Sequence, residues 1–489
     1  MIRSAASPET PTAGPTGAAR PSRAVWWAAV AAAVVVIIVV AAVINGAGGA
    51  PAPVGQTIAS STTWEPPLDR AERLVTDILT RRSSAVLKGD EQAWLADVDP
   101  GDPEVLALER VRFRNWQQLR PVKFDLLYNS ASPLTLPPSG QPSGAVVSRH
   151  TVHLVMQMEA DVALNRADYT YTVALTGDAA RVVDVAHLSH DSPDADRKRF
   201  GDPVFDAPWD TVPLRSARQG SVTVLAPENS RWDPAAYVGA AARAETFVRS
   251  LWAQRRAPGG FVILLADDRE FIQWFGYGRT ESAEGVAGYI NCAEISAANG
   301  TPKDVILGDD SKAGCRAVLR MSTVRNDHEA YTLMVHELAH AIGPYLMTDV
   351  YFGGDREWLN KPTWAIEGFA EWAENLAGGD AEIRQGTDLV KRHWAKYRPS
   401  ESDLAIPLPL NQDFFTTDAT RNTFNYELSA TFFRAVEQTG GRQKAVDLYV
   451  KLATSSELVT DTRLFLDPVI REHGIDPDRL WQTHQDVIG

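Results

Sequence analysis

The segment Asp327–Pro344, which reads DHEAYTLMVHELAHAIGP, constrains the fold more than any other part of the chain. Asn326 and Glu329 have the spacing of a helix-capping box, and apolar residues then recur with helical periodicity. The pattern predicts a helix over this segment. His336 and His340 stand four residues apart on it, so their imidazoles project from one face about one turn apart. Two histidines on a partly exposed helix face, without a metal, are the alternative.

Two imidazoles at this spacing can share one tetrahedral metal ion, and zinc is the usual choice. Glu337 follows the first histidine, where its carboxylate can accept a proton from a water that the metal activates. A catalytic zinc site needs three protein ligands and one open position. The extended pattern HExxHxxGxxH would supply the third ligand nearby, but its last position is Leu346, which cannot bind zinc. The third ligand must come from another segment.

A second helix is predicted over Lys361–Ala377, which reads KPTWAIEGFAEWAENLA, and Glu367 on it is the expected third ligand. The two segments together resemble the motifs of the gluzincin zinc metallopeptidases. Their second motif takes forms such as W-x-x-E-G-x-A, which is matched here by Trp364, Glu367, Gly368 and Ala370. The resemblance implies a zincin-type domain that holds one Zn²⁺ through His336, His340 and Glu367 and hydrolyses peptide or protein substrates with Glu337 as general base.

Two further residues are expected near the metal. Glu371 lies one turn after Glu367 and resembles the acid that accepts the free N–H of a ligating histidine in thermolysin-like enzymes. A solvated acid on the helix face is the alternative. Tyr426, which opens the apolar run YELSATFFRAVEQTGG, resembles the tyrosine that stabilises the oxyanion in aminopeptidase-like gluzincins. Packing in the core or at a helix cap is the alternative for this tyrosine.

Other functions remain open from the sequence. One alternative is a catalytically silent, zinc-containing scaffold or interaction module of the cell surface. Hydrolysis of a non-peptide bond by the same chemistry is another. For a peptidase, the apolar strand expected at Arg316–Ser322 could pair with an extended substrate. The net charge of −14, without any basic cluster, argues against a nucleic-acid partner.

The N-terminal part predicts attachment to a membrane. Ala24–Ile44 has no charge, Pro or Gly over a length that spans the hydrocarbon core, and a long secretory signal is the alternative. The preceding residues 1–23 carry three arginines and one acid, which places them in the cytoplasm by the positive-inside rule. We therefore expect a single-pass protein of the cell membrane whose catalytic domain is extracellular. In that compartment Cys292 and Cys315 are expected to form a disulfide, with two buried thiols as the alternative.

The remaining chain is expected to hold a linker and two folded domains. Residues 45–67 are rich in Gly, Ala, Pro, Ser and Thr and predict a flexible linker. Residues 68–200 predict helices followed by antiparallel strands, an α+β domain that resembles the cone-shaped nuclear-transport-factor-like domains. Residues 211–489 form the gluzincin-like domain, with an α-helical C-terminal part. The expected fold class is α+β, preceded by a transmembrane helix.

Overall fold

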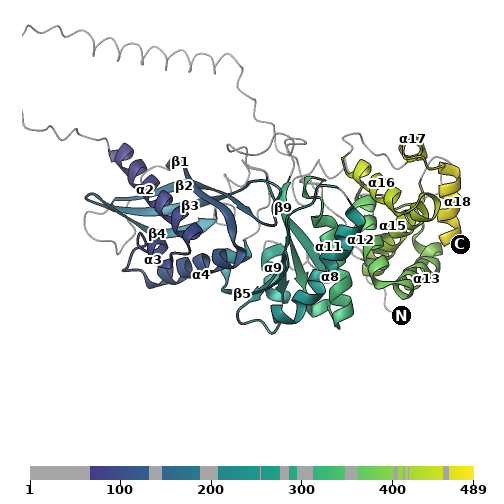
Figure 1. Ribbon diagram of the computed structural model, residues 1–489, viewed down its shortest axis with the longest axis horizontal. Coiled ribbons are helices and arrows are strands. Elements are labelled where there is room, and N and C mark those ends of the chain that lie inside the picture. The colour runs from purple at the N-terminus through teal and green to yellow at the C-terminus, as the bar shows by residue number, and fades with distance from the viewer. Residues whose placement is uncertain are drawn as a thin grey trace, which may run out of the picture. The chain divides into compact units, whose positions relative to one another are not determined.

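The protein is an α+β fold with two sheets and many helices (Figure 1). The computed structural model describes residues 67–131, 146–187, 207–253, 255–275, 286–294, 312–346, 362–399, 406–410, 414–416, 418–454 and 462–488. All of these belong to one compact unit.

The N-terminal part of this unit is an antiparallel meander preceded by three helices. The helices are α2 (Pro67–Lys88), α3 (Glu91–Leu95) and α4 (Pro103–Leu119). The strands are β1 (Pro121–Ala131), β2 (Val146–Met158), β3 (Asn165–Thr176) and β4 (Ala179–His187), in the order β1-β2-β3-β4. The predicted strands are present. Helix α4 was not predicted, although Asp102 caps it and Pro103 occupies its first turn.

The second sheet is mixed, with the order β5-β6-β7-β9-β8. Its strands are β5 (Leu214–Gln219), β6 (Val222–Pro227), β7 (Phe261–Ala266), β8 (Gly288–Glu294) and β9 (Lys312–Arg320). The short helix α7 (Pro208–Thr211) precedes it, α8 (Pro234–Trp252) connects the parallel strands β6 and β7, and α9 (Asp268–Phe275) follows β7. Every residue of β7 is buried, as expected for a strand covered on both faces. Cys292 and Cys315 lie opposite each other on β8 and β9 and form a disulfide.

Helices account for most of the remaining described residues. They are η1 (Met321–Thr323), α11 (Asp327–Ala341), η2 (Pro344–Leu346), α12 (Thr363–Gly378), α13 (Asp380–Tyr397), α15 (Ala419–Gly440), α16 (Arg442–Thr454), α17 (Arg463–Glu472) and α18 (Pro477–Ile488). Helix α11 packs on α8, β9 and α12, and α12 in turn packs on α15 (Figure 1). The predicted helices that carry the two motifs correspond to α11 and α12.

The prediction of a single-pass membrane protein needs correction. No helix among the described residues is both long and apolar enough to cross a membrane. The longest, α2 and α15, have 22 residues each, and charged side chains recur along both. The predicted transmembrane helix, residues 24–44, lies outside the described residues, as do the predicted tail and most of the linker. The described fold is therefore α+β, and no helix in the described part of the chain supports the predicted single-pass location in the cell membrane.

A buried ion pair joins the turn between β2 and β3 to the second sheet. Asp161 lies in this turn, and its Oδ1 is 2.6 Å from Nη1 of Arg316 on β9. Both side chains are almost fully buried. The other carboxylate oxygen of Asp161 accepts hydrogen bonds from Met158 N and Asn165 Nδ2, at 2.8 and 2.7 Å. The turn is thereby fixed against β9, the inner strand next to β8.

Replacing Asp161 by Ala is expected to destabilise the protein by about 3–5 kcal/mol, because the Arg316 guanidinium would remain buried without its carboxylate. Urea unfolding of the two proteins measures this difference. Glu159→Ala is the matched control, since Glu159 pairs with Arg218 at the surface and its loss should cost less than about 1 kcal/mol. Equal unfolding midpoints for the two variants would contradict the role of the buried pair.

Candidate metal centre

Helix α11 presents three of the site residues on its buried side. Asn326 caps the helix by accepting hydrogen bonds from the backbone N–H groups of His328 and Glu329, both at 3.0 Å. The capping residue predicted from sequence is therefore confirmed. Ten residues or more further along, the side chains of His336, Glu337 and His340 are almost fully buried. Burying these polar groups is unfavourable unless they find partners.

Helix α12 places Glu367 opposite the two histidines. The helix is anchored by Trp364, which is fully buried and packs edge-on against Phe432 of α15 with ring centroids 5.1 Å apart. Gly368 permits α12 to approach α15 closely, because a Cβ there would lie 2.6 Å from Cβ of Ser429. The close packing of α12 on α15 therefore explains why a glycine follows Glu367.

The three predicted ligands converge. Oε2 of Glu367 lies 3.5 Å from Nε2 of His336 and 3.4 Å from Nε2 of His340. One donor atom from each of the three residues lies within 4.8 Å of the others. Two donors that share a tetrahedral ion at about 2.0–2.1 Å would lie roughly 3.3–3.5 Å apart, so the separations fit a bound ion. His336, His340 and Glu367 could therefore hold a metal ion.

A carboxylate that sequence reasoning missed accepts the outer hydrogen bond of the first histidine. Nδ1 of His336 lies 3.0 Å from Oε2 of Glu374 and 3.5 Å from Oε2 of Glu371, the residue expected in this role. Glu374 lies seven residues after Glu367, two turns along the same face of α12. This spacing is the feature of the sequence that could have identified Glu374 as a partner of His336. Either carboxylate would hold His336 in the tautomer that directs Nε2 toward the metal.

The pKa values of the ligands reflect burial and mutual charge. Burial lowers the pKa of His336, but hydrogen bonds with Glu367, Glu371 and Glu374 raise it well above its ordinary value. Burial lowers the pKa of His340 despite the nearby Glu367 carboxylate. Burial raises the pKa of Glu367, but the charges and hydrogen bonds of the two histidines outweigh it and lower that pKa far below the usual range. Glu367 is thus held as a carboxylate, the form that binds a metal.

Glu337 faces the edge of the second sheet. A Cβ on Gly288, the first residue of β8, would lie 2.4 Å from Oε1 of Glu337, so the backbone of β8 passes directly beside this carboxylate. Burial raises the pKa of Glu337 to about 8. Strand β9, which was expected to pair with a substrate, instead pairs with β7 on one side and β8 on the other. Among the described strands, β8 is the one at this end of the sheet.

Tyr426 of the C-terminal helices lies beside the first histidine. Its ring centroid is 5.9 Å from that of His336. The helix that carries it, α15, begins at Ala419, so Tyr426 lies two turns inside the helix rather than opening it. Burial, and then the charges of Glu367, Glu337 and Glu371, raise the pKa of Tyr426 well above its ordinary value. The hydroxyl therefore keeps its proton.

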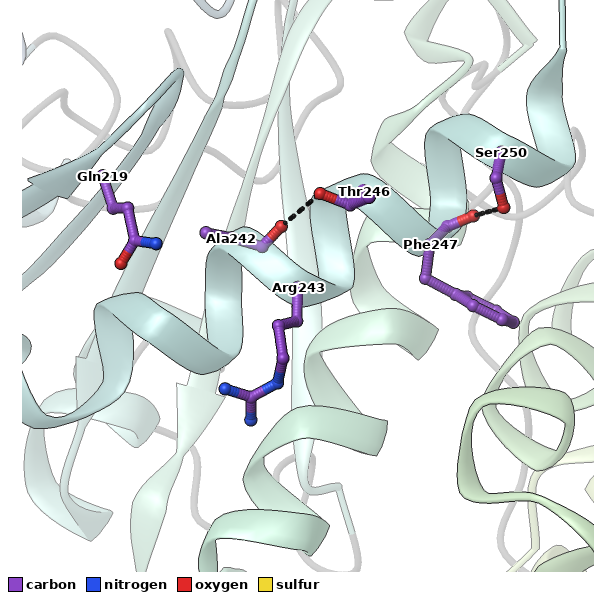
Figure 2. Close-up of a pocket in the computed structure, with 6 residues that line it drawn as sticks. All are labelled: Gln219, Ala242, Arg243, Thr246, Phe247 and Ser250. Atoms are coloured by element: carbon purple, nitrogen blue, oxygen red, sulfur yellow. Dashed lines mark hydrogen bonds between the residues drawn. The ribbon is translucent and has the colours of Figure 1, made fainter.

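A surface hollow of about 430 Å³ lies away from these residues, between α8 and the end of β5. It is lined by Gln219, Ala242, Arg243, Thr246, Phe247 and Ser250 (Figure 2). The Thr246 and Ser250 hydroxyls donate to carbonyl groups of their own helix, at 2.9 and 2.6 Å, rather than into the hollow. None of the residues that could hold a metal ion lines it.

No protein family and no curated protein was found to match the chain. The site itself consists of two imidazoles, one ionised carboxylate and a further buried carboxylate beside them.

Replacing Glu374 by Gln is expected to weaken metal binding by about 10- to 100-fold, because His336 would lose its charged hydrogen-bond acceptor. Competition between the protein and a chelator, with Zn²⁺ as probe, measures the affinity. Glu371→Gln is the matched variant and should have the smaller effect, since this carboxylate is 3.5 Å from Nδ1. The reverse order would show that Glu371 is the working acceptor.

Proposed function

We propose that the protein is a zinc-dependent peptidase in which His336, His340 and Glu367 hold one Zn²⁺ and Glu337 is the general base. The convergence of these three donors carries the proposal. Two imidazoles and one carboxylate form a ligand set used by zinc hydrolases, and three protein ligands leave a position open. A zinc ion held there supplies Lewis acidity, which polarises a carbonyl group and makes water a better nucleophile.

Glu337 supports hydrolysis rather than a structural role for the metal. It is buried beside the ligands but is not one of the three converging donors. A structural site has no use for an additional buried carboxylate, which is costly to keep without a partner. Burial keeps the Glu337 carboxyl protonated at neutral pH, with a pKa of about 8, and the charge of a cation nearby would return it to the ionised form that accepts a proton from the attacking water. The same carboxylate can then pass the proton to the leaving amine.

Tyr426 is suited to stabilise the negative charge that develops on the substrate carbonyl oxygen. Its ring lies beside that of His336, and its raised pKa keeps the hydroxyl protonated and able to donate a hydrogen bond. A donor fixed in a buried site stabilises such a charge more than water does, because it need not reorient during the reaction.

Strand β8 supports a peptide as the substrate. It lies at the end of the sheet, and its first residue, Gly288, passes beside Glu337. An extended peptide can bind such an edge by adding a strand through main-chain hydrogen bonds. Because Gly288 has no side chain, the Glu337 carboxylate can lie directly beside this end of β8, next to a peptide bound along the edge.

Replacing Glu337 by Gln is expected to lower peptide turnover by about 10²- to 10⁴-fold while the protein retains its metal, because the base is lost and the ligands remain. Glu367→Ala should instead lose the metal as well as the activity. Cleavage of casein or a peptide library, together with metal analysis, measures both. Equal cleavage by wild type and Glu337→Gln would indicate a non-catalytic metal-binding scaffold, and full metal occupancy in Glu367→Ala would reassign the third ligand.

Replacing Tyr426 by Phe is expected to lower kcat by about 10²- to 10³-fold, with metal content and KM nearly unchanged, because the hydroxyl acts mainly in the transition state. Steady-state kinetics on a single peptide measures the two constants separately. An unchanged kcat would show that Tyr426 serves only in packing.

A further inference from the structure

An exposed aromatic ring stands next to the proposed oxyanion donor. Phe415 is 52% exposed, whereas most large apolar side chains of the described residues are buried. Its ring centroid is 6.3 Å from that of Tyr426, which in turn is 5.9 Å from that of His336. Phe415 therefore packs against a ring, that of Tyr426, which itself packs against the proposed metal ligand His336. Phe465 is exposed to a similar degree, 49%, but belongs to α17.

The backbone around Phe415 is held on both sides by side chains of α15. Asn425 Nδ2 donates to the carbonyl oxygen of Phe414 at 2.9 Å. Asn422 accepts from the backbone N–H of Thr416 at 2.7 Å and donates to its carbonyl oxygen at 2.8 Å. These bonds hold the backbone on both sides of Phe415, so a ligand that contacts its ring need not order the backbone first.

The ring of Phe415 also packs against a buried aromatic side chain. Phe414 is fully buried and contacts both neighbours, with ring centroids 5.1 Å from Phe415 and 5.2 Å from Tyr426. All three pairs meet edge to face, which is a favourable arrangement for aromatic rings. Phe414, Phe415 and Tyr426 thus form one aromatic cluster, and Phe415 is its exposed member.

We propose that Phe415 determines specificity by contacting an apolar side chain of the bound peptide near the scissile bond. The inference rests on the proposed peptidase function and names its substrate class: peptides with an aromatic or large aliphatic residue at that position. Burying such a side chain against an exposed ring removes apolar surface of both from water, which favours binding. An extended peptide advances by about 3.3 Å per residue, so this residue lies within about three positions of the cleaved bond.

Cleavage of paired peptides tests the proposal in the full-length protein. The peptides differ at one position, Leu or Ser, and each of the three positions on either side of the cleaved bond is tried in turn. Wild type should prefer Leu at one position by about 10- to 100-fold in kcat/KM. Phe415→Ala should lose most of that preference by cleaving the Leu peptide more slowly, with the Ser peptide unaffected. Phe415→Leu should retain the preference, because the contact is apolar rather than specifically aromatic.

Phe465→Ala is the matched control and should leave both peptides unaffected, since this exposed ring lies on α17. An undiminished Leu preference in Phe415→Ala would overturn the proposal, as would an equal loss for both peptides. If Glu337→Gln still abolishes cleavage in that case, the proposed peptidase function survives without it.

Measurements of peptide binding test the role of Phe415 independently of catalysis. The affinity of the Leu and Ser peptides for Glu337→Gln is measured by fluorescence anisotropy and compared with that for the double variant Glu337→Gln/Phe415→Ala. The Leu peptide should bind the single variant more tightly, and the second substitution should remove that difference. The same difference in both variants, or no preference in either, would overturn the role of Phe415 whether or not the protein cleaves peptides.

Discussion

Three polar side chains on two buried helices must be held within a few ångströms of one another, and the rest of the structure is arranged around that constraint. His336 and His340 come from α11 and Glu367 from α12, and all three are almost fully buried. Such groups are costly in an apolar interior unless they pair or bind a cation. The close contact of α12 with α15 at Gly368 and the buried indole of Trp364 hold Glu367 at the required position.

The surroundings of the histidines are rich in carboxyl groups. Glu371 and Glu374 approach His336 from α12, and Glu427 of α15 accepts a hydrogen bond from Asn375 at 3.0 Å. Burial and the neighbouring acids raise the pKa values of Glu371 and Glu427. A cation in their midst would relieve this mutual repulsion, so the charge of the whole region, as well as the three ligands, favours metal binding.

The sheet and the aromatic side chains define the other walls of the site. Strand β8 brings its backbone to Glu337 because Gly288 leaves room for the carboxylate, and the disulfide between Cys292 and Cys315 joins this strand to β9. Beside His336, the ring of Tyr426 packs against the buried ring of Phe414. The proposed metal ligands, the proposed base and hydrogen-bond donor, and the exposed Phe415 therefore come from elements that pack on one another, and little rearrangement is needed to bring them together.

Helical periodicity is a short-range property, so the sequence alone determined that His336 and His340 share one face of a capped helix and that Glu367 lies on a second helix. It could not determine which acid meets His336. Glu371 and Glu374 lie on the same face of α12, and only the rotation of that helix against α11 brings Glu374 to 3.0 Å. Likewise, the place of β9 inside the sheet, the contact of Gly288 with Glu337 and the position of Phe415 beside Tyr426 depend on packing between segments far apart in the chain. Tertiary structure alone decides such contacts, because residue spacing carries no information about how two distant elements are oriented.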